Sequence, residues 1–412
     1  MSRETDRAGL VSAASIERAA RAGRGVVRET PILTTRTLSE RAGTKIVLKA
    51  ENLQGTGSFK LRGATAKLAA LGAEAAAGVV CGSAGNHAQA VAYAARSRGV
   101  PCEVFMPEAA PIAKAEAVQA LGATLHLGGQ SVDECVAAAK ERAAEAGMQF
   151  IHPFDDVDVI SGQGSVGLEL LHQVPDLARV VVPVGGGGLI SGIAVAIRSQ
   201  RPEVEIIGIQ VEACAPFVAS LQAGAPVAVD SVRTIADGIA IKRPAEITLQ
   251  LIGAFVKDML VVSEDQVAEA MVFLMERTKL VVEGAGAVGV AALLGDRLPG
   301  PVDGATVLVL SGGNVGAGML AEVARRHETQ ARRRLVLRVR ISDLPGSLAA
   351  LLATVSGAGA NLVDVQHIRE GVDLHIQETA VQLVLETRGA EHAAAVRAAI
   401  AAGGYRQATE LL

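Results

Sequence analysis

The stretch Val180-Val-Val-Pro-Val-Gly-Gly-Gly-Gly-Leu-Ile-Ser-Gly-Ile-Ala-Val-Ala-Ile-Arg198 decides the fold. A β-branched apolar run leads into four glycines and then into an apolar run of helical length, a pattern typical of a strand followed by a helix. Consecutive glycines cost conformational entropy, so a plain tight turn explains them poorly. They do allow several backbone N–H groups at a helix start to face one anion. The pattern predicts a phosphate site at Gly185, Gly186, Gly187, Gly188 and Leu189.

The same alternation extends on both sides of this stretch, from about Ile46 to Leu320. The run Val79-Val80-Cys81 precedes a helical stretch at Ala88–Arg96, and the runs Glu205–Val211 and Thr306–Leu310 are further candidate strands. Continuous apolar strands separated by helices predict parallel sheets that are covered on both faces. The fold class is therefore α/β with open, parallel or mixed sheets.

The pattern changes near His327. Residues 326–334 are polar without apolar periodicity, which predicts a linker. Beyond them Leu335 to Ile341 alternate as a half-buried strand does. A turn, a helical run (Ser347–Ser356), two strand-like runs (Asn361–Ile368 and Asp373–Glu386), another helical run (Glu391–Ala402) and a short end strand follow. The order βαββαβ predicts a small ferredoxin-like domain at residues 335–412.

Composition excludes several classes of function. The net charge is −4, aromatic residues make up 2% and there is no Trp, so neither nucleic acid nor an anionic membrane is an expected partner. The four cysteines are far apart and no cluster has zinc-ligand spacing, which indicates free thiols in a reducing cytosol and no metal site. The charged N-terminus lacks the apolar region of a secretory signal, and no apolar run reaches about 18 residues. A soluble cytoplasmic protein is expected.

Two further glycine-rich junctions and one lysine complete a candidate site. Gly82-Ser83-Ala84-Gly85-Asn86-His87 combines small residues, a hydroxyl and an amide at a predicted helix start, which suits a carboxylate or a ring oxygen. Ser311-Gly312-Gly313-Asn314 follows the strand at Thr306–Leu310. Lys60 stands among small and apolar residues in Gly55-Thr-Gly-Ser-Phe-Lys60, where a partly buried amine can act as a Schiff-base nucleophile.

Gly284-Ala-Gly-Ala-Val-Gly289 matches the G-x-G-x-x-G pattern of dinucleotide sites. Such a site follows a strand and has an acidic residue at the end of the next strand. Asp303 precedes the next candidate strand instead, so a helix start packed closely on a sheet is the preferred interpretation. A nicotinamide oxidoreductase remains a distant alternative.

Together the motifs Ser58-Phe-Lys-Leu-Arg-Gly63, Ser83-Ala-Gly-Asn-His87, the tetraglycine loop and Leu310-Ser-Gly-Gly-Asn314 resemble the fold-type II pyridoxal-phosphate enzymes, closely their threonine dehydratase and serine racemase branch. The resemblance implies a large cofactor domain at residues 1–75 and 153–325 with a small domain at 76–152 inserted in it. It also implies dehydration and deamination of L-threonine to 2-oxobutanoate and ammonia, or of L-serine to pyruvate, as a first step towards isoleucine.

The resemblance assigns roles to single residues. Lys60 would bind pyridoxal 5′-phosphate and remove the Cα proton, Phe59 would pack beside the pyridine ring, Asn86 would hydrogen-bond its phenolic oxygen, and Ser311 would face its nitrogen. Gly185 to Leu189 would cradle the phosphate. The substrate carboxylate would be held by residues of the second junction, namely Ser83, Ala84, Gly85, Asn86 and His87.

Two positions depart from parts of the family. Racemases of this branch have a serine as second base where this chain has Ala84, so racemisation is disfavoured. Some members bind a divalent metal after the strand that ends near Glu212, but no acid occurs in the next five positions here, so no metal is predicted and only a structural or monovalent-ion role for Glu212 stays open.

The last 80 or so residues resemble an ACT regulatory domain. This resemblance implies an amino-acid effector, such as a branched-chain amino acid, at Asp343-Leu344-Pro345-Gly346, and a homo-oligomer (dimer or tetramer). Three alternatives remain: a related lyase or β-replacement enzyme (hydroxyaspartate lyase or cysteine synthase-like), the nicotinamide enzyme, and an amino-acid sensor built on the C-terminal domain alone. The resemblance is compatible with threonine or serine as the preferred substrate and with a biosynthetic or a catabolic role.

Overall fold

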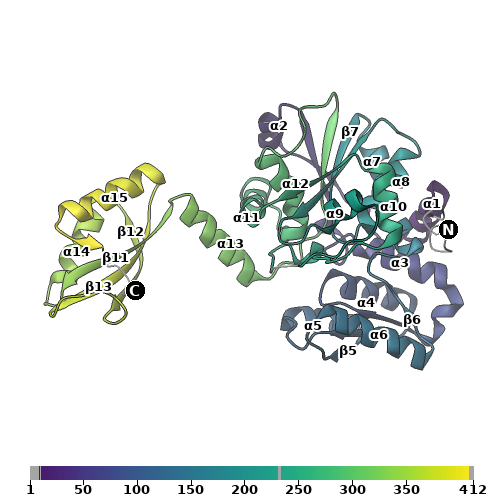
Figure 1. The fold of residues 1–412 in the computed structure, drawn as a ribbon, viewed down its shortest axis with the longest axis horizontal. Helices are drawn as coiled ribbons and strands as arrows, with labels where there is room; N and C mark the ends of the chain where they lie inside the picture. Colours follow the sequence, from purple (N-terminus) through teal and green to yellow (C-terminus); the bar gives the residue numbers. More distant parts are fainter. Residues whose placement is uncertain (1–8, 10, 231–232, 408–412) are drawn as a thin grey trace. The chain divides into compact units, whose positions relative to one another are not determined.

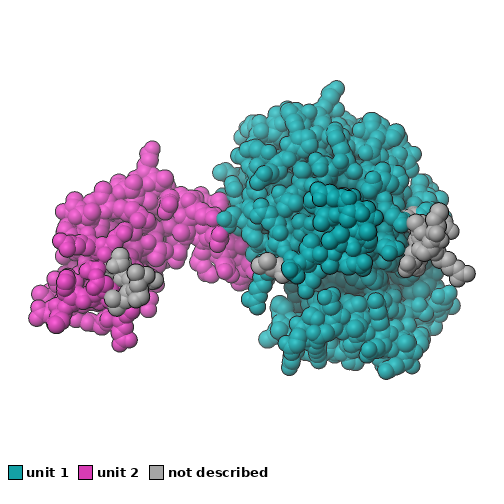
Figure 2. All heavy atoms as spheres, in the orientation of Figure 1, with its two compact units in different colours: residues 1–316 teal, residues 317–412 magenta. Residues whose placement is uncertain are grey.

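The computed structural model describes residue 9, residues 11–230 and residues 233–407 (Figure 1). The chain divides into two compact units, Met1–Gly316 and Ala317–Leu412 (Figure 2). The first unit contains a six-stranded and a four-stranded sheet, and the second contains a four-stranded sheet. The division falls before the predicted linker at residues 326–334, and the finer domain boundaries within unit 1 stay a prediction.

The large sheet of unit 1 has the strand order β1-β2-β10-β7-β8-β9. Only β1 runs antiparallel to its neighbour, and the other pairs are parallel, as the continuous apolar runs predicted. The strands are β1 (Ile32–Thr34), β2 (Lys45–Ala50), β7 (Leu177–Pro183), β8 (Glu205–Val211), β9 (Asp258–Val262) and β10 (Ala305–Leu310). Because β2, β10, β7 and β8 are parallel neighbours, the loops that follow them meet at one edge of the sheet.

Helices cover this sheet. The tetraglycine stretch connects β7, which ends at Pro183, to α8 (Gly188–Arg198), whose apolar residues are buried. Helix α12 (Gly284–Leu294) is buried along its whole length because it contacts four strands of the sheet and α11 (Glu264–Phe273). The other helices around this sheet are α1 (Ala13–Ala22), α2 (Arg36–Ala42), α3 (Lys60–Leu71), α7 (Val157–Gln173), α9 (Pro216–Ala223) and α10 (Glu246–Phe255).

The second sheet of unit 1 has the order β5-β4-β3-β6, and all its strands are parallel. Its strands β3 (Val79–Gly82), β4 (Cys102–Met106), β5 (Thr124–Leu127) and β6 (Gln149–Phe150) all fall within residues 76–152, where the small domain is predicted. It is accompanied by α4 (Asn86–Arg98), α5 (Ile112–Ala120) and α6 (Val132–Ala146). Helix α3 packs against α4, which accompanies the small sheet, and against α7, which lies by the large sheet. It therefore connects the two parts of unit 1 that are built around these sheets.

Unit 2 begins with α13 (Ala317–Gln330). This helix runs through the first half of the segment predicted as a linker, and only residues 331–333 lie between it and β11 (Arg334–Ser342). Val323 is the only residue of this helix, all of which lies in the described part of the chain, that is buried. A helix that exposes most of its surface needs little apolar periodicity, which explains why the pattern did not indicate a helix.

The rest of unit 2 has the predicted order βαββαβ, with an antiparallel sheet in the order β12-β13-β11-β14. Its elements after β11 are α14 (Ser347–Gly357), β12 (Asn361–Ile368), β13 (Glu378–Glu386), α15 (Ala390–Ala402) and β14 (Arg406–Gln407). Strand β13 starts later than the predicted Asp373, because Gln377 has a φ of 76°, which a strand residue does not adopt. Leu335, Leu337, Val339 and Ile341 are buried on one face of β11, as predicted.

None of the described helices is long and apolar enough to cross a membrane.

Candidate active site

Backbone hydrogen bonds join the lysine motif to the Ser311 motif at the edge of the large sheet. Phe59 N–H donates to the Ser311 carbonyl at 3.0 Å, and Gly313 N–H donates to the Gly57 carbonyl at 2.9 Å. The side chain of Asn314 donates to the Thr56 carbonyl at 2.8 Å. Two predicted motifs, one after β2 and one after β10, therefore form a single structural element.

Lys60 is the first residue of α3, and its amine is shielded from solvent. The Nζ atom donates to the carbonyl of Pro153 at 2.7 Å and lies 5.3 Å from the centroid of the Phe59 ring. Burial lowers the pKa of Lys60 to about 8, and the nearby Glu283 opposes that shift only in part. A larger fraction of this amine is therefore neutral near physiological pH than in an exposed lysine, which favours its action as a nucleophile or base.

The tetraglycine loop lies close to the lysine through the segment at Pro153-Phe154. A Cβ atom placed on Gly186 would come within 2.2 Å of the Phe154 ring, so this ring lies directly against the loop. Gly187 has a φ of 88° and is the N-cap of α8 without a side-chain cap. The first-turn N–H groups of α8 therefore have no capping side chain as acceptor, and a phosphate can take that place.

Asn86, Asn314 and Glu283 form a hydrogen-bonded cluster beside the Ser311 motif. Asn86 Nδ2 donates to Glu283 Oε1 at 2.7 Å, and Asn314 Nδ2 donates to Asn86 Oδ1 at 2.8 Å. Gly312 contacts Glu283 so closely that an added Cβ would lie 2.3 Å from the carboxylate. The amide predicted to meet the ring oxygen is therefore held in a fixed orientation by a carboxylate and a second amide.

Sequence reasoning did not identify Glu283 as a site residue. In the sequence it directly precedes the glycines of the G-x-G-x-x-G match, and nothing in that position indicates a site. Burial, and next the negative charge of Asp237, raise the pKa of Glu283 to about 7. A buried carboxyl with a raised pKa beside a buried amine is typical of a functional site, but only the fold brings it to Asn86.

Replacing Glu283 by glutamine is expected to flatten the pH dependence of stability. The folded state keeps the proton of Glu283 up to about pH 7, whereas a free carboxyl with a pKa near 4.5 has lost it, so the folded protein is destabilised as pH rises between these values. The glutamine variant, which cannot ionise, should escape a loss of about 2–3 kcal/mol. Urea unfolding of the cofactor-free protein at pH 5 and pH 8 measures it, and equal pH dependence in both proteins would contradict the assignment.

The Ser83-Ala-Gly-Asn-His motif lies at the start of α4, after β3. Gly85 is the N-cap without a side-chain cap, and its N–H donates to Ser83 Oγ at 3.2 Å. The His87 side chain instead binds the carbonyl of Ile151 at 2.9 Å, and burial lowers the pKa of His87 to about 3. Because the neutral imidazole is already hydrogen-bonded to the Ile151 carbonyl, it does not donate to a carboxylate at the start of α4. Only the backbone N–H of His87 can bind a carboxylate at this helix start.

The remaining predicted positions lie elsewhere. In the G-x-G-x-x-G match, a Cβ on Gly284 would lie 2.3 Å from the Ile235 carbonyl and one on Gly286 would lie 2.7 Å from that of Gly312. These glycines serve close packing of α12, which does not follow a strand. Asp343 in unit 2 pairs with Arg369 at 2.9 Å. Among the described residues, no group of three or more His, Cys, Asp or Glu side chains could hold a metal.

Comparisons with known proteins agree with this geometry. The family model described as pyridoxal-phosphate dependent enzyme matches residues 24–313. A Thermotoga maritima protein named L-threonine ammonia-lyase is 42% identical over 398 residues, which is 96% of this chain and 98% of the relative. The solved structures of a threonine deaminase from T.th. (41% identity, TM-score 0.69) and of maize serine racemase (33% identity, TM-score 0.73) align with 74% and 78% of this chain, and with 99% of each of those chains.

The matched residues include the lysine motif, the Asn86 junction, the tetraglycine loop and the Ser311 motif up to Gly313. A buried lysine amine of lowered pKa is what a cofactor that forms a covalent bond to lysine requires. This chain therefore belongs to the family of pyridoxal-phosphate dependent enzymes.

Proposed function

We propose that this chain is an L-threonine ammonia-lyase, which converts L-threonine into 2-oxobutanoate and ammonia and L-serine into pyruvate and ammonia. The observation that carries the proposal is the buried Lys60 amine, held at the Pro153 carbonyl between the Asn86 junction and the tetraglycine loop. The similarity over almost the full length to a relative named L-threonine ammonia-lyase supports this choice within the family.

The residues present fit pyridoxal 5′-phosphate. The uncapped first turn of α8 offers backbone N–H groups and a positive dipole end to a phosphate, and Gly187 adopts a backbone conformation that favours glycine. Asn86 accepts a hydrogen bond from Asn314 of the Ser311 motif, and the Ser311 carbonyl accepts one from the N–H of Phe59, the residue before Lys60. Ser311 is buried. When bound, pyridoxal phosphate supplies an electron sink that stabilises negative charge at the substrate Cα atom.

The protein's own groups then divide the chemistry. Lys60, with its lowered pKa, removes the proton from the substrate Cα atom. The uncapped first turn of α4 binds the substrate carboxylate and so orients the Cα–H bond toward the amine. Ala84 offers no side-chain proton at this junction, so a single base acts and elimination is favoured over racemisation. Loss of the β-hydroxyl and subsequent hydrolysis release the oxo acid and ammonia.

Steady-state assays separate this function from its alternatives. Purified protein with pyridoxal phosphate should form 2-oxobutanoate and an equal amount of ammonia from L-threonine. Ammonia release from 3-hydroxyaspartate alone, or cysteine formation from an activated serine and sulfide without threonine turnover, would instead identify the hydroxyaspartate lyase or cysteine synthase-like alternative.

We further infer that unit 2 is an ACT-like regulatory module that binds a branched-chain amino acid. Its βαββαβ order and antiparallel sheet support this inference. So does the turn Asp343–Gly346, since Gly346 begins α14 as an N-cap with a φ of 92° and no side-chain cap. Strand β12 lies at the end of the sheet and exposes Val363 and Val365, which favours pairing with a second copy.

Full-length protein should therefore respond to isoleucine or valine. The threonine saturation curve is expected to shift by about 5- to 150-fold in half-saturating concentration, the range of typical allosteric coupling. A variant with Asp343→Ala, which loses the ion pair to Arg369, should change the effector concentration needed and leave basal turnover unaltered. If neither amino acid changes turnover at any threonine concentration, unit 2 does not have this regulatory role.

A further inference from the structure

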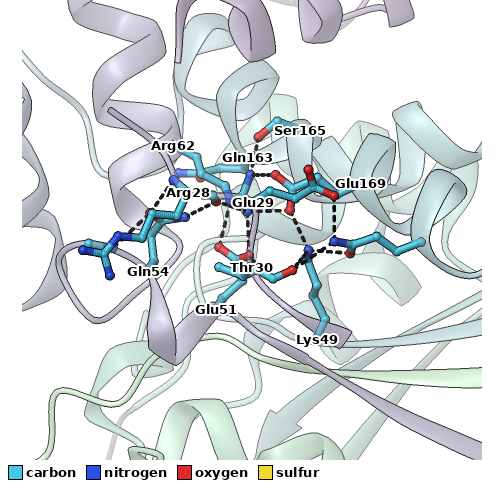
Figure 3. A network of polar contacts seen from close by, with 12 residues as sticks. Arg28, Glu29, Thr30, Lys49, Glu51, Gln54, Arg62, Gln163, Ser165 and Glu169 are labelled. Carbon is cyan, nitrogen blue, oxygen red and sulfur yellow. Dashed lines mark hydrogen bonds and ion pairs between the residues drawn. The ribbon is translucent and has the colours of Figure 1, made fainter. Parts of the chain in front are cut away.

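A buried ionic network surrounds Arg62 in the first turn of α3 (Figure 3), and its members do not include Pro153, the partner of the Lys60 amine. Its charged members are Arg62 and Lys49, which are cations, and Glu51 and Glu169, which are anions. The side chains of Arg62, Lys49 and Glu51 are at most 1% exposed, and that of Glu169 is 17% exposed. The two positive and two negative charges sum to zero, and they are largely shielded from water. None of these four residues takes part in the reaction steps described above.

Arg62 is the centre of this network. Its Nε and Nη2 atoms both donate to Glu51 at 2.7 Å, and Nη1 and Nη2 donate to Glu169 at 2.6 and 2.9 Å. Nη1 also donates to Ser165 Oγ at 3.0 Å. A guanidinium has five N–H donors, and here all five have acceptors. Arg62 binds each carboxylate through two N–H groups, which is the bidentate geometry of strong arginine–carboxylate pairs.

The acceptors of Arg62 come from three separate parts of the fold. Glu51 follows the end of β2, Glu169 lies on α7, and Arg62 also contacts the Arg28 carbonyl at 3.3 Å (Figure 3). Lys49 from β2 binds Glu169 at 2.5 Å and the Thr30 carbonyl at 2.8 Å, which closes the network. The guanidinium therefore ties the start of α3 to the sheet, to a neighbouring helix and to the segment before β1.

The start of α3 needs such an anchor. Its N-cap, Phe59, makes no side-chain cap hydrogen bond, and its first turn is closed by the Arg62 N–H donating to the Phe59 carbonyl at 3.0 Å. Arg62 is two residues after Lys60, so its side chain leaves the helix on a different face from the lysine. The turn that carries the amine is thus held from one side by the backbone bonds to the Ser311 motif and from the other by Arg62.

We propose that Arg62 is a positioning residue for the reaction. Its ion pairs with Glu51 and Glu169 fix the first turn of α3, and this turn sets the position of the Lys60 amine. The inference rests on the proposed function and adds a residue to it. A lysine at position 62 would keep the charge but would lose the planar fork that holds two carboxylates together.

The decisive comparison is between Arg62→Lys and Arg179→Lys in the full-length protein. Arg179 is also a buried arginine of unit 1, 3% exposed, bound to Glu205 at 2.7 Å and to the carbonyls of Pro299 and Gly300. It lies on β7, and none of its partners belongs to α3. Both variants lose a buried arginine fork, so a purely structural role predicts similar consequences for both.

Both variants are expected to lower the melting temperature. Only Arg62→Lys should also reduce kcat for threonine by about 10- to 100-fold, the effect of a misplaced catalytic group, with KM changed less than about twofold. It should also slow, by a similar factor, the covalent capture of pyridoxal phosphate by cofactor-free protein, followed by visible absorbance without any substrate. Arg179→Lys should leave kcat and capture within about twofold of wild type.

Three results would overturn the proposal: normal capture and kcat in Arg62→Lys, equal losses in both variants, or a loss confined to KM. If Arg62→Lys does not fold, Glu169→Gln, which keeps the Arg62–Glu51 pair, serves as the second variant and should show the same selective slowing in milder form. Because capture needs no substrate, a failure of the wild type to deaminate threonine refutes the proposed function and leaves this comparison valid.

Discussion

Replacing Lys60 by alanine should reduce threonine turnover by about 10³-fold or more while the protein still folds. Under the proposed function, the variant would lose both the nucleophile that binds the cofactor and the base that removes the substrate Cα proton. Its amine makes one hydrogen bond, to the Pro153 carbonyl at 2.7 Å, so its removal leaves a single backbone acceptor to be satisfied by water. Initial rates of 2-oxobutanoate formation measure the loss.

Lys67→Ala is the matched control for this variant. Lys67 lies on the same helix, α3, and its amine pairs with Asp156 at 2.7 Å and Asp158 at 3.0 Å, outside the site. Its replacement should lower stability slightly and leave turnover nearly unchanged. Near wild-type turnover by Lys60→Ala would show that the chemistry does not depend on this amine, and the site would have to be placed elsewhere.

Replacing Gly187 by alanine is the second large expected effect. Gly187 has a φ of 88°, and its added Cβ would lie 2.8 Å from Phe217 Cζ and 2.9 Å from both Ile252 Cδ1 and Thr248 Cβ. The backbone conformation costs about 1–2 kcal/mol for an alanine and the overpacking about 1–3 kcal/mol. Relief of this strain should move the first-turn amides of α8, so the Kd for pyridoxal phosphate is expected to rise about 10- to 100-fold.

Gly224→Ala separates the two contributions. Gly224 ends α9 with a φ of 66°, and an added Cβ meets nothing within 4 Å. This variant should carry the conformational cost alone and bind the cofactor normally. Titration of cofactor-free protein with pyridoxal phosphate, together with thermal unfolding, compares the two variants, and an unaltered Kd in Gly187→Ala would argue against the phosphate role of this loop.

The sequence predicted the elements that repeat a local pattern. The strand at Glu205–Val211 and the strand at Asn361–Ile368 have the predicted bounds, because apolar runs and alternation depend only on neighbouring residues. The helices that follow the glycine junctions begin two residues before the predicted Ala88 and Ile190, since glycine and polar residues at a helix start hide its first turn. Membership of the pyridoxal-phosphate family, and with it the cofactor, was also predicted correctly from the combined motifs.

What the sequence did not indicate depends on contacts between distant segments. Glu283 reaches Asn86 only because α12 is packed against the loop that follows β10. The His87 side chain is hydrogen-bonded to the Ile151 carbonyl, a contact that no local pattern indicates. The ionic network around Arg62 combines residues of β2, of the turn that follows it, of α3 and of α7, each of which looks like an ordinary surface charge in the sequence.

The pairing of β2 with β10 also bears on how the protein is made. β10 lies between β2 and β7 in the sheet. In the segment after β10, the Asn314 side chain donates to the carbonyl of Thr56 in the lysine motif, although the two residues are 258 positions apart in the chain. During synthesis the Lys60 segment leaves the ribosome long before its partner strand exists, and loop closure over that separation is slow and entropically costly. A nascent chain that ends before β10 should therefore be unable to retain pyridoxal phosphate. We expect the cofactor to bind only after nearly all of unit 1 has been translated.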